Sequence, residues 1–219
     1  MIKYPNVASG LKILFISELI QIVGGLVSNV SSISIVGIVL KIIGLVAAAY
    51  GISGARKDSC SGFDTAFIVV TANAVANIIL IFLSANSKIY TIITLAAGIL
   101  SLMVIYYIIN SSNRLLLDIR DISNAGLGET VWKYTKVGLI VVVVSTFLTI
   151  ISALSLSPYM LMLCSIIMLV GALISLAAQI MFIVYLYKSS ASLNTPISTE
   201  DPFAQYYENQ DNINSGRRF

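Results

Sequence analysis

Six polar side chains lie inside stretches that are otherwise apolar, and they are the residues of this chain best suited to binding or chemistry. A carboxylate or an amine in apolar surroundings can form an ion pair or bind a polar solute or ion, and amides both donate and accept hydrogen bonds. The set contains one acid, one base and four amides: Glu18, Lys41, Gln21, Asn73, Asn77 and Gln179.

Residues for conventional catalysis are scarce. The chain has no histidine, and its two cysteines, Cys60 and Cys164, do not form a CxxC pair. No phosphate-binding loop, HExxH or GxSxG motif is present. Asp118 and Asp121 lie one turn apart, which is typical of a solvated helix face and less typical of a divalent-cation site. We therefore expect no enzyme activity, no metal and no cofactor.

The composition indicates how these polar residues are held. Hydrophobic residues make up 58% of the 219 residues and charged residues only 11%, about half the charged share of a soluble domain. Because a transmembrane helix needs about 20 apolar residues, the sequence predicts an all-α polytopic membrane protein with six transmembrane helices in three helical hairpins. The predicted spans are about 10–29, 33–53, 64–84, 90–110, 134–155 and 159–187.

The positive residues predict the orientation. Of the 13 Lys and Arg residues, eleven fall on the side that holds both termini, and Lys88 falls on the other side. Cytoplasmic loops carry the excess of Lys and Arg, so both termini are expected in the cytoplasm. The basic residues behind the net charge of +3 then serve mostly to orient the chain in the membrane. The lipid bilayer, rather than nucleic acid, is the expected partner. The first apolar run contains Glu18 and exceeds the length of a signal peptide, so we expect it to be retained.

Two segments outside the predicted spans differ from them in composition and periodicity. The loop 110–133 places Leu115, Leu116 and Ile119 on one helical face, which predicts either a short amphipathic helix on the inner membrane surface or a continuation of the fourth span. Residues 1–190 would form the transmembrane domain. The polar segment 191–219 shows no periodicity and is expected to be a disordered cytoplasmic tail.

A stripe of small residues runs along the second span. Successive members are three or four residues apart and therefore share one helical face, which lets another helix approach closely. Lys41 is the exception on this face, so we expect its side chain to point toward protein or a cavity. The small members are Gly37, Gly44, Ala48 and Gly51.

Glu18 on the first span is the predicted partner of Lys41. Glu18 lies roughly 12 Å and Lys41 roughly 18 Å from the inner membrane edge, a difference that the long lysine side chain can cover. Pairing would offset part of the ~2.5–3.5 kcal/mol cost of a lone charge at mid-membrane. Two interpretations of the whole polar layer stay open: a site for a polar solute or ion, or hydrogen bonds that hold the helices together.

The opening "YPNVASGLKILFISELIQIV", with the alternating short and basic loops that follow, resembles uncharacterised small multi-span proteins of Gram-positive-type bacteria. The resemblance implies a bacterial plasma membrane and no particular activity. The segments "VASGLKILF", "CSGFDTAFI" and "TVWKYTKVG" each precede an outbound helix and indicate a weak three-hairpin repeat.

Two functions follow as hypotheses. The first is a non-enzymatic accessory or assembly subunit, which would contact a membrane-protein partner or a second copy of itself. The alternative is a small transporter or channel for a polar solute or ion, with its site at the midplane polar layer.

Overall fold

The computed structural model describes residues 3–30, 33–58, 62–83, 87–155 and 158–196, and within these ranges every regular element is a helix. The prediction of an all-α fold is therefore confirmed for this part of the chain. Its elements are α1 Pro5–Ser28, α2 Ser34–Ala55, the 3-10 turn η2 Arg56–Asp58, α3 Gly62–Phe82, α4 Lys88–Asp118, α5 Ile122–Ser155 and α6 Pro158–Leu193.

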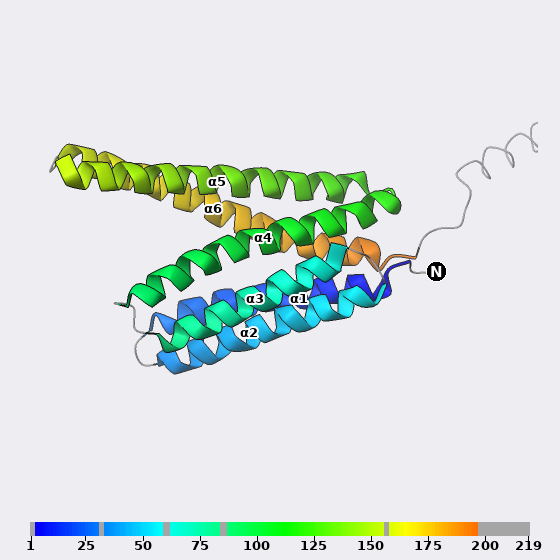
Figure 1. Ribbon diagram of the computed structural model, residues 1–219. Helices are drawn as coiled ribbons and strands as arrows, with labels where there is room; N and C mark the ends of the chain where they lie inside the picture. Colours follow the sequence, from blue (N-terminus) through cyan, green and yellow to red (C-terminus); the bar gives the residue numbers. More distant parts are fainter. Residues whose placement is uncertain (1–2, 31–32, 59–61, 84–86, 156–157, 197–219) are drawn as a thin grey trace, which may run out of the picture.

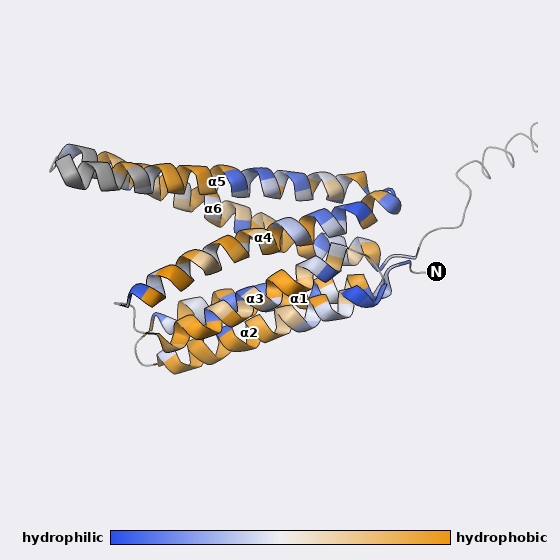
Figure 2. Cartoon of the chain, viewed as in Figure 1, coloured by the Kyte–Doolittle hydropathy of each residue, from blue (hydrophilic) through white to orange (hydrophobic). Residues whose placement is uncertain are grey.

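Five helices within the described residues, namely α1 to α4 and α6, are long and apolar enough to cross a membrane. The sixth predicted span, 134–155, ends in a part of α5 whose side chains lie outside the described residues. Figure 2 shows apolar residues along most of the helices and hydrophilic residues near the end that carries the N-terminus. This distribution is typical of a chain whose apolar surface faces lipid.

The loop predicted at 110–133 is not a loop, and no separate amphipathic helix forms there. α4 continues to Asp118, a short turn follows, and α5 begins at Ile122. Leu115 and Leu116 are only 8% and 0% exposed, because they pack into the core shared by the helix ends. Of the two predicted alternatives, the structure has the continuation of the fourth span. A helix that leaves the membrane can continue while its apolar face stays covered by protein.

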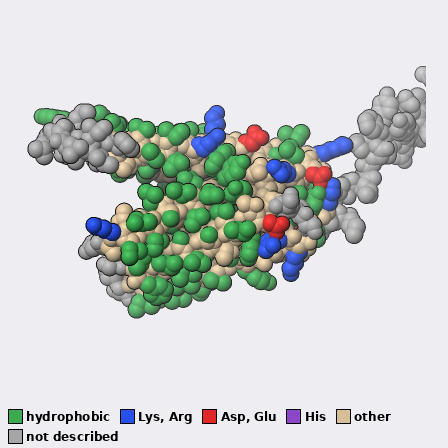
Figure 3. Space-filling view, in the orientation of Figure 1, with side chains coloured by type: hydrophobic (Ala, Val, Ile, Leu, Met, Phe, Trp, Pro, Cys, Tyr) green, Lys and Arg blue, Asp and Glu red, His purple; other side chains and the backbone are tan. Residues whose placement is uncertain are grey.

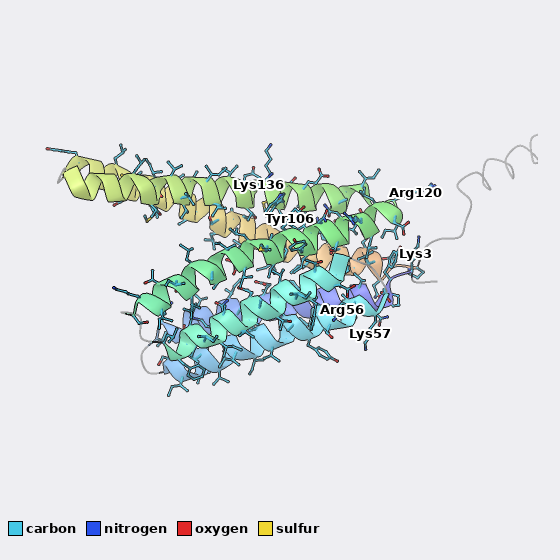
Figure 4. All side chains as sticks on the ribbon, viewed as in Figure 1. Lys3, Arg56, Lys57, Tyr106, Arg120 and Lys136 are labelled. Atoms are coloured by element: carbon cyan, nitrogen blue, oxygen red, sulfur yellow. The ribbon has the colours of Figure 1, made fainter. Side chains whose placement is uncertain are left out.

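Neighbouring helices in the sequence pack against each other: α1 against α2, α3 against α4, and α5 against α6. α6 also returns to α1, so both ends of the described chain lie at the same end of the molecule (Figure 1). Away from this end α5 and α6 diverge from the other four helices, and a gap opens between the two groups (Figures 1 and 3). Charged side chains gather at the closed end, where Lys3, Arg56, Lys57 and Arg120 are labelled in Figure 4.

Hydrogen bonds between helix ends hold the closed end together. Asp118 at the end of α4 accepts from Lys3 and from the hydroxyl of Tyr4, each at 2.5 Å. Asp58 accepts from the backbone N–H of Val7 at 2.9 Å and caps the start of α1 from another element. These contacts tie the first helix to the ends of α2 and α4.

The α4–α5 turn is tied to α6 in the same way. Asp121 caps α5 by accepting the backbone N–H of Asn124 at 3.0 Å, and its other oxygen accepts the hydroxyl of Ser192 on α6. Two turns deeper, Tyr185 of α6 donates to Asn113 of α4 at 2.7 Å. Asp118 is exposed and Asp121 is partly exposed, and in addition the two carboxylates accept hydrogen bonds from different segments of the chain. Cys60 and the tail from residue 197 onward lie outside the described residues.

Candidate functional site

A cavity of about 390 Å³ lies between α5 and α6 and the helices that face them. It is bounded by α1, α3, α4, α5 and α6, and a volume of this size is typical of small-molecule sites. Four of the six polar residues predicted from the sequence line it: Glu18, Gln21, Asn73 and Gln179. The structure therefore brings together residues that are distant in the sequence and that share only their depth along the helices.

Glu18 reaches the cavity from the middle of α1. It lies about 20 Å along the helix from Pro5, and Gln21 follows three residues later on the same face. Within the part of the chain that the structure describes, the Glu18 carboxylate makes no hydrogen bond and no ion pair. An unpaired carboxylate inside a membrane is costly, so its position on an open cavity requires an explanation.

Asn73 is held in place by two neighbours. Its side-chain oxygen accepts from Ser101 of α4 at 3.1 Å and from the amide of Asn77 at 3.0 Å. Asn77 also donates to the backbone oxygen of Asn73 at 2.8 Å and does not line the cavity. Asn77 is therefore a supporting residue that fixes Asn73.

Three hydroxyl groups add to the lining. Thr135 of α5 donates to the backbone oxygen of Val131, and Ser175 of α6 donates to that of Gly171, both at 2.9 Å. Ser101 donates to Asn73 as described. Each hydroxyl hydrogen is engaged, and the lone pairs of the oxygens remain available to a ligand.

Lys41 does not take part in this layer, and the predicted Glu18–Lys41 ion pair is not formed. Lys3–Asp118 and Arg56–Asp64 form ion pairs, and neither pair involves Glu18 or Lys41. The Cε atom of Lys41 lies 3.7 Å from the position that a Cβ atom on Gly25 would occupy. Gly25 is two turns, about 10 Å, farther along α1 than Glu18. The aliphatic part of Lys41 thus lies against α1 nearer the C-terminal end of that helix than Glu18 does.

The small-residue stripe of α2 lies against α1. Gly37, Gly44, Ala48 and Gly51 are all buried. A Cβ atom on Gly37 would meet the backbone nitrogen of Ser28 at 2.2 Å, and one on Gly51 would meet the backbone oxygen of Gly10 at 2.8 Å. This close backbone contact fixes the rotation of α1, and with it the direction of the Glu18 side chain.

A second, smaller cavity of about 30 Å³ lies behind the main one. Glu18, Gln21 and Asn73 line both cavities, so their side chains form the wall between them. The smaller space can hold one or two water molecules. Such water would hydrate the carboxylate from the side that a ligand does not reach.

Sequence reasoning missed Thr135 and Ser175 as lining residues. A signal for Ser175 was present, because Gly171, Ser175 and Gln179 are spaced by four residues and share one face of α6. Thr135 had no comparable signal, since it lies beyond the polar layer in a stretch with charged neighbours. Its position depends on the packing of α5.

Comparison of the chain with known proteins found no matching family model, no matching curated protein and no matching solved structure. The function is therefore argued from the geometry of the cavity.

Proposed function

We propose that this chain is an integral membrane protein that binds a small polar solute in the cavity around Glu18, as a transporter or channel would. The observation that carries the proposal is the unpaired Glu18 carboxylate on a cavity of about 390 Å³. Residues that served only to hold helices together would be expected to bond to one another. Glu18, Gln21 and Gln179 instead face open space, which favours a ligand site.

The proposed topology is three helical hairpins in a bacterial plasma membrane with both termini in the cytoplasm. The gathering of charged side chains at the end that holds the N-terminus supports this orientation (Figures 3 and 4). The helix ends are tied together there, and the helices diverge at the opposite end. The cavity would then be reached from the external side.

A binding role fits the lining better than a catalytic one. Glu18 is the ionisable side chain among the described residues that line the cavity. Acid–base catalysis uses a second group to return or relay the proton. The lining offers amides and hydroxyls beside Glu18, and these groups orient a ligand.

Thiol labelling tests whether water reaches the cavity. In a variant with Cys60→Ser and Cys164→Ala, Ser175→Cys is placed on the cavity wall and Leu173→Cys on the lipid-facing side of α6 at nearly the same depth. Leu173 is 58% exposed and does not line the cavity. A charged, membrane-impermeant thiol reagent added to intact cells should label position 175 at least tenfold faster than position 173.

Equal, slow labelling of both positions would contradict the proposal, provided that the denatured proteins react normally. The cavity would then be a dry interface, and the alternative of an accessory subunit would be favoured. A groove between α3 and α4 is consistent with that alternative, since it contains the buried Thr71 hydroxyl, which has no hydrogen-bond partner among the described residues.

A further inference from the structure

The atoms that line the cavity are unevenly divided between donors and acceptors. The hydroxyl hydrogens of Ser101, Thr135 and Ser175 are used within the protein, so each of these oxygens can only accept from a ligand. In its ionised form the Glu18 carboxylate also only accepts. The lining therefore suits a ligand rich in hydrogen-bond donors.

The side-chain amides of the lining weaken the preference for a donor-rich ligand but do not reverse it. Because Asn73 uses its side-chain oxygen to accept from Ser101 and Asn77, its NH2 group is the part left for a ligand. Gln21 and Gln179 can present either their oxygen or their nitrogen. A ligand can thus carry one acceptor group near α3 while its donors face the other walls.

Glu18 is the one lining residue among those described that can carry a charge, and that charge is negative. No Lys or Arg occurs among the described lining residues, and Lys41 lies against Gly25 instead. A carboxylate in low-dielectric surroundings is stabilised by a cation that pairs with it directly. The ligand that best offsets the cost of Glu18 is therefore positively charged.

The remaining walls are apolar. Leu102, Leu139, Val142 and Phe182 line the same space, and the volume is far larger than a single coordinated metal ion requires. A cation with an apolar part can cover these side chains and exclude water from them. The cavity thus combines a charged, acceptor-rich region with an apolar region.

We propose that the cavity binds a primary ammonium ion carried on a short apolar chain, with Glu18 as its counter-ion and the oxygens of Ser101, Thr135 and Ser175 as hydrogen-bond acceptors. The inference rests on the proposed function, because it names the ligand class for the same cavity. A primary ammonium has three donors, which matches the acceptors better than a quaternary ammonium that has none.

Binding of three matched probes tests the proposal. n-Butylammonium, n-butyltrimethylammonium and n-butanol share their alkyl chain and differ in charge or in N–H donors. Ligand-observed saturation-transfer NMR on the full chain in lipid nanodiscs would give the Kd of each. We expect n-butylammonium to bind at least tenfold more tightly than n-butanol and several-fold more tightly than the quaternary ion.

Two sets of variants assign the binding to this cavity. Glu18→Gln should raise the Kd for n-butylammonium at least tenfold, whereas Glu129→Gln, at an exposed position on the other side of α5, should leave it unchanged. The double variant Thr135→Val and Ser175→Ala should weaken n-butylammonium and leave the quaternary ion unaffected. If Glu18→Gln does not fold, these hydroxyl variants show whether n-butylammonium binds in this cavity.

Other outcomes would overturn the inference. Equal affinity for n-butanol and n-butylammonium, or an unchanged Kd in Glu18→Gln, would show that charge does not select the ligand. Rapid labelling of Ser175→Cys with no binding of any probe would reject the ammonium proposal and leave a wet solute site. Absence of both labelling and binding would reject the proposed function as well.

Discussion

At the residue scale, the role of each polar side chain in the apolar helices depends on which of its hydrogen-bonding atoms already have a partner within the protein. The side-chain amide of Asn77 donates to Asn73, and the side-chain oxygen of Asn73 accepts from Ser101 and Asn77. Glu18 has no such partner among the described residues. The first group holds helices, and Glu18 faces the cavity, although all of these residues occupy the same polar layer. Residue type alone therefore does not separate structural from ligand-binding positions.

Asn77→Ala tests the supporting role at this scale. The substitution removes both hydrogen bonds to Asn73, and each interhelical or polar bond in a membrane protein contributes about 0.6 kcal/mol on average. We expect the free energy of unfolding to fall by about 1 kcal/mol. Asn29→Ala removes a single bond of 3.1 Å from the residue that follows α1 to the backbone oxygen of Gly25, at an exposed position, and serves as the control. An equal effect of the two variants, measured by unfolding in mixed micelles, would contradict the supporting role.

At the element scale, glycine contacts decide which face of each helix meets its neighbour. α1 and α2 approach so closely that a Cβ atom on Gly37 would meet the backbone of Ser28. α5 and α6 show a similar contact, since a Cβ atom on Gly138 would lie 2.7 Å from the hydroxyl oxygen of Ser175. The first contact directs Glu18 toward the cavity and the second places Ser175 on its wall. Helix packing thus supplies the geometry of the site.

Two alanine substitutions in α2 test this packing. Gly37→Ala should lower the free energy of unfolding by about 1–3 kcal/mol, because the new methyl group meets backbone that cannot rotate away. At Gly54 a Cβ atom would meet nothing within 4 Å. Gly54→Ala should therefore be neutral or stabilise the helix by up to about 1 kcal/mol. Thermal unfolding of both variants in the same detergent gives the comparison, and equal melting temperatures would argue against a tight α1–α2 interface.

At the scale of the whole molecule, one end is closed by hydrogen bonds and the other is open. The closing contacts join the start of α1 to α4 through Asp118, and the α4–α5 turn to α6 through Asp121. The hydrogen bond to Asp118 raises the pKa of the Lys3 amine, which therefore stays protonated at neutral pH. At the opposite end α5 and α6 diverge from the other helices (Figure 1), and the cavity lies between these two helices and α1, α3 and α4. Access to the site thus depends on which end of the bundle is open.

Asp121 makes the closed end sensitive to acid. Burial alone would raise the pKa of its carboxyl, but the hydrogen bonds from Ser192 and Asn124 outweigh this effect and lower the pKa below its ordinary value. A carboxylate with a lowered pKa stabilises the fold above its unfolded-state pKa of about 3.9 and loses that contribution as the pH falls through its folded-state value. The contribution should therefore be constant between about pH 5 and 7 and disappear below about pH 4.

The comparison of wild type with Asp121→Asn isolates the charge, because asparagine caps a helix about as well as aspartate. The difference in melting temperature between the two proteins should be constant from pH 7 to 5 and shrink below pH 4. Asp121→Ala, which also loses the cap, should cost a further 0.5–2 kcal/mol, roughly independent of pH. A difference that already changes between pH 7 and 5 would assign the pH dependence to another group.

The sequence by itself predicted the α-helices and the positions of the polar residues along them. Apolar stretches long enough to span a membrane predicted the six α-helices but not the 3-10 turn η2, and counting 1.5 Å per residue placed Glu18, Gln21, Asn73 and Gln179 in one layer. The helix ends were less predictable. α4 continues past its predicted end, since Leu115 and Leu116 stay covered by protein there. Hydropathy reports where a residue lies along the membrane normal and not which neighbour covers it.

Only the tertiary structure decided which members of that layer meet. Lys41 has the depth and residue type of a partner for Glu18, yet the close contact of α1 and α2 places it beside Gly25. Thr135 and Ser175 belong to the site because α5 and α6 supply one side of the cavity wall. The rotation of each helix about its axis is set by the packing of small residues between backbones. This packing depends on all six helices together, so no single stretch of the sequence contains it.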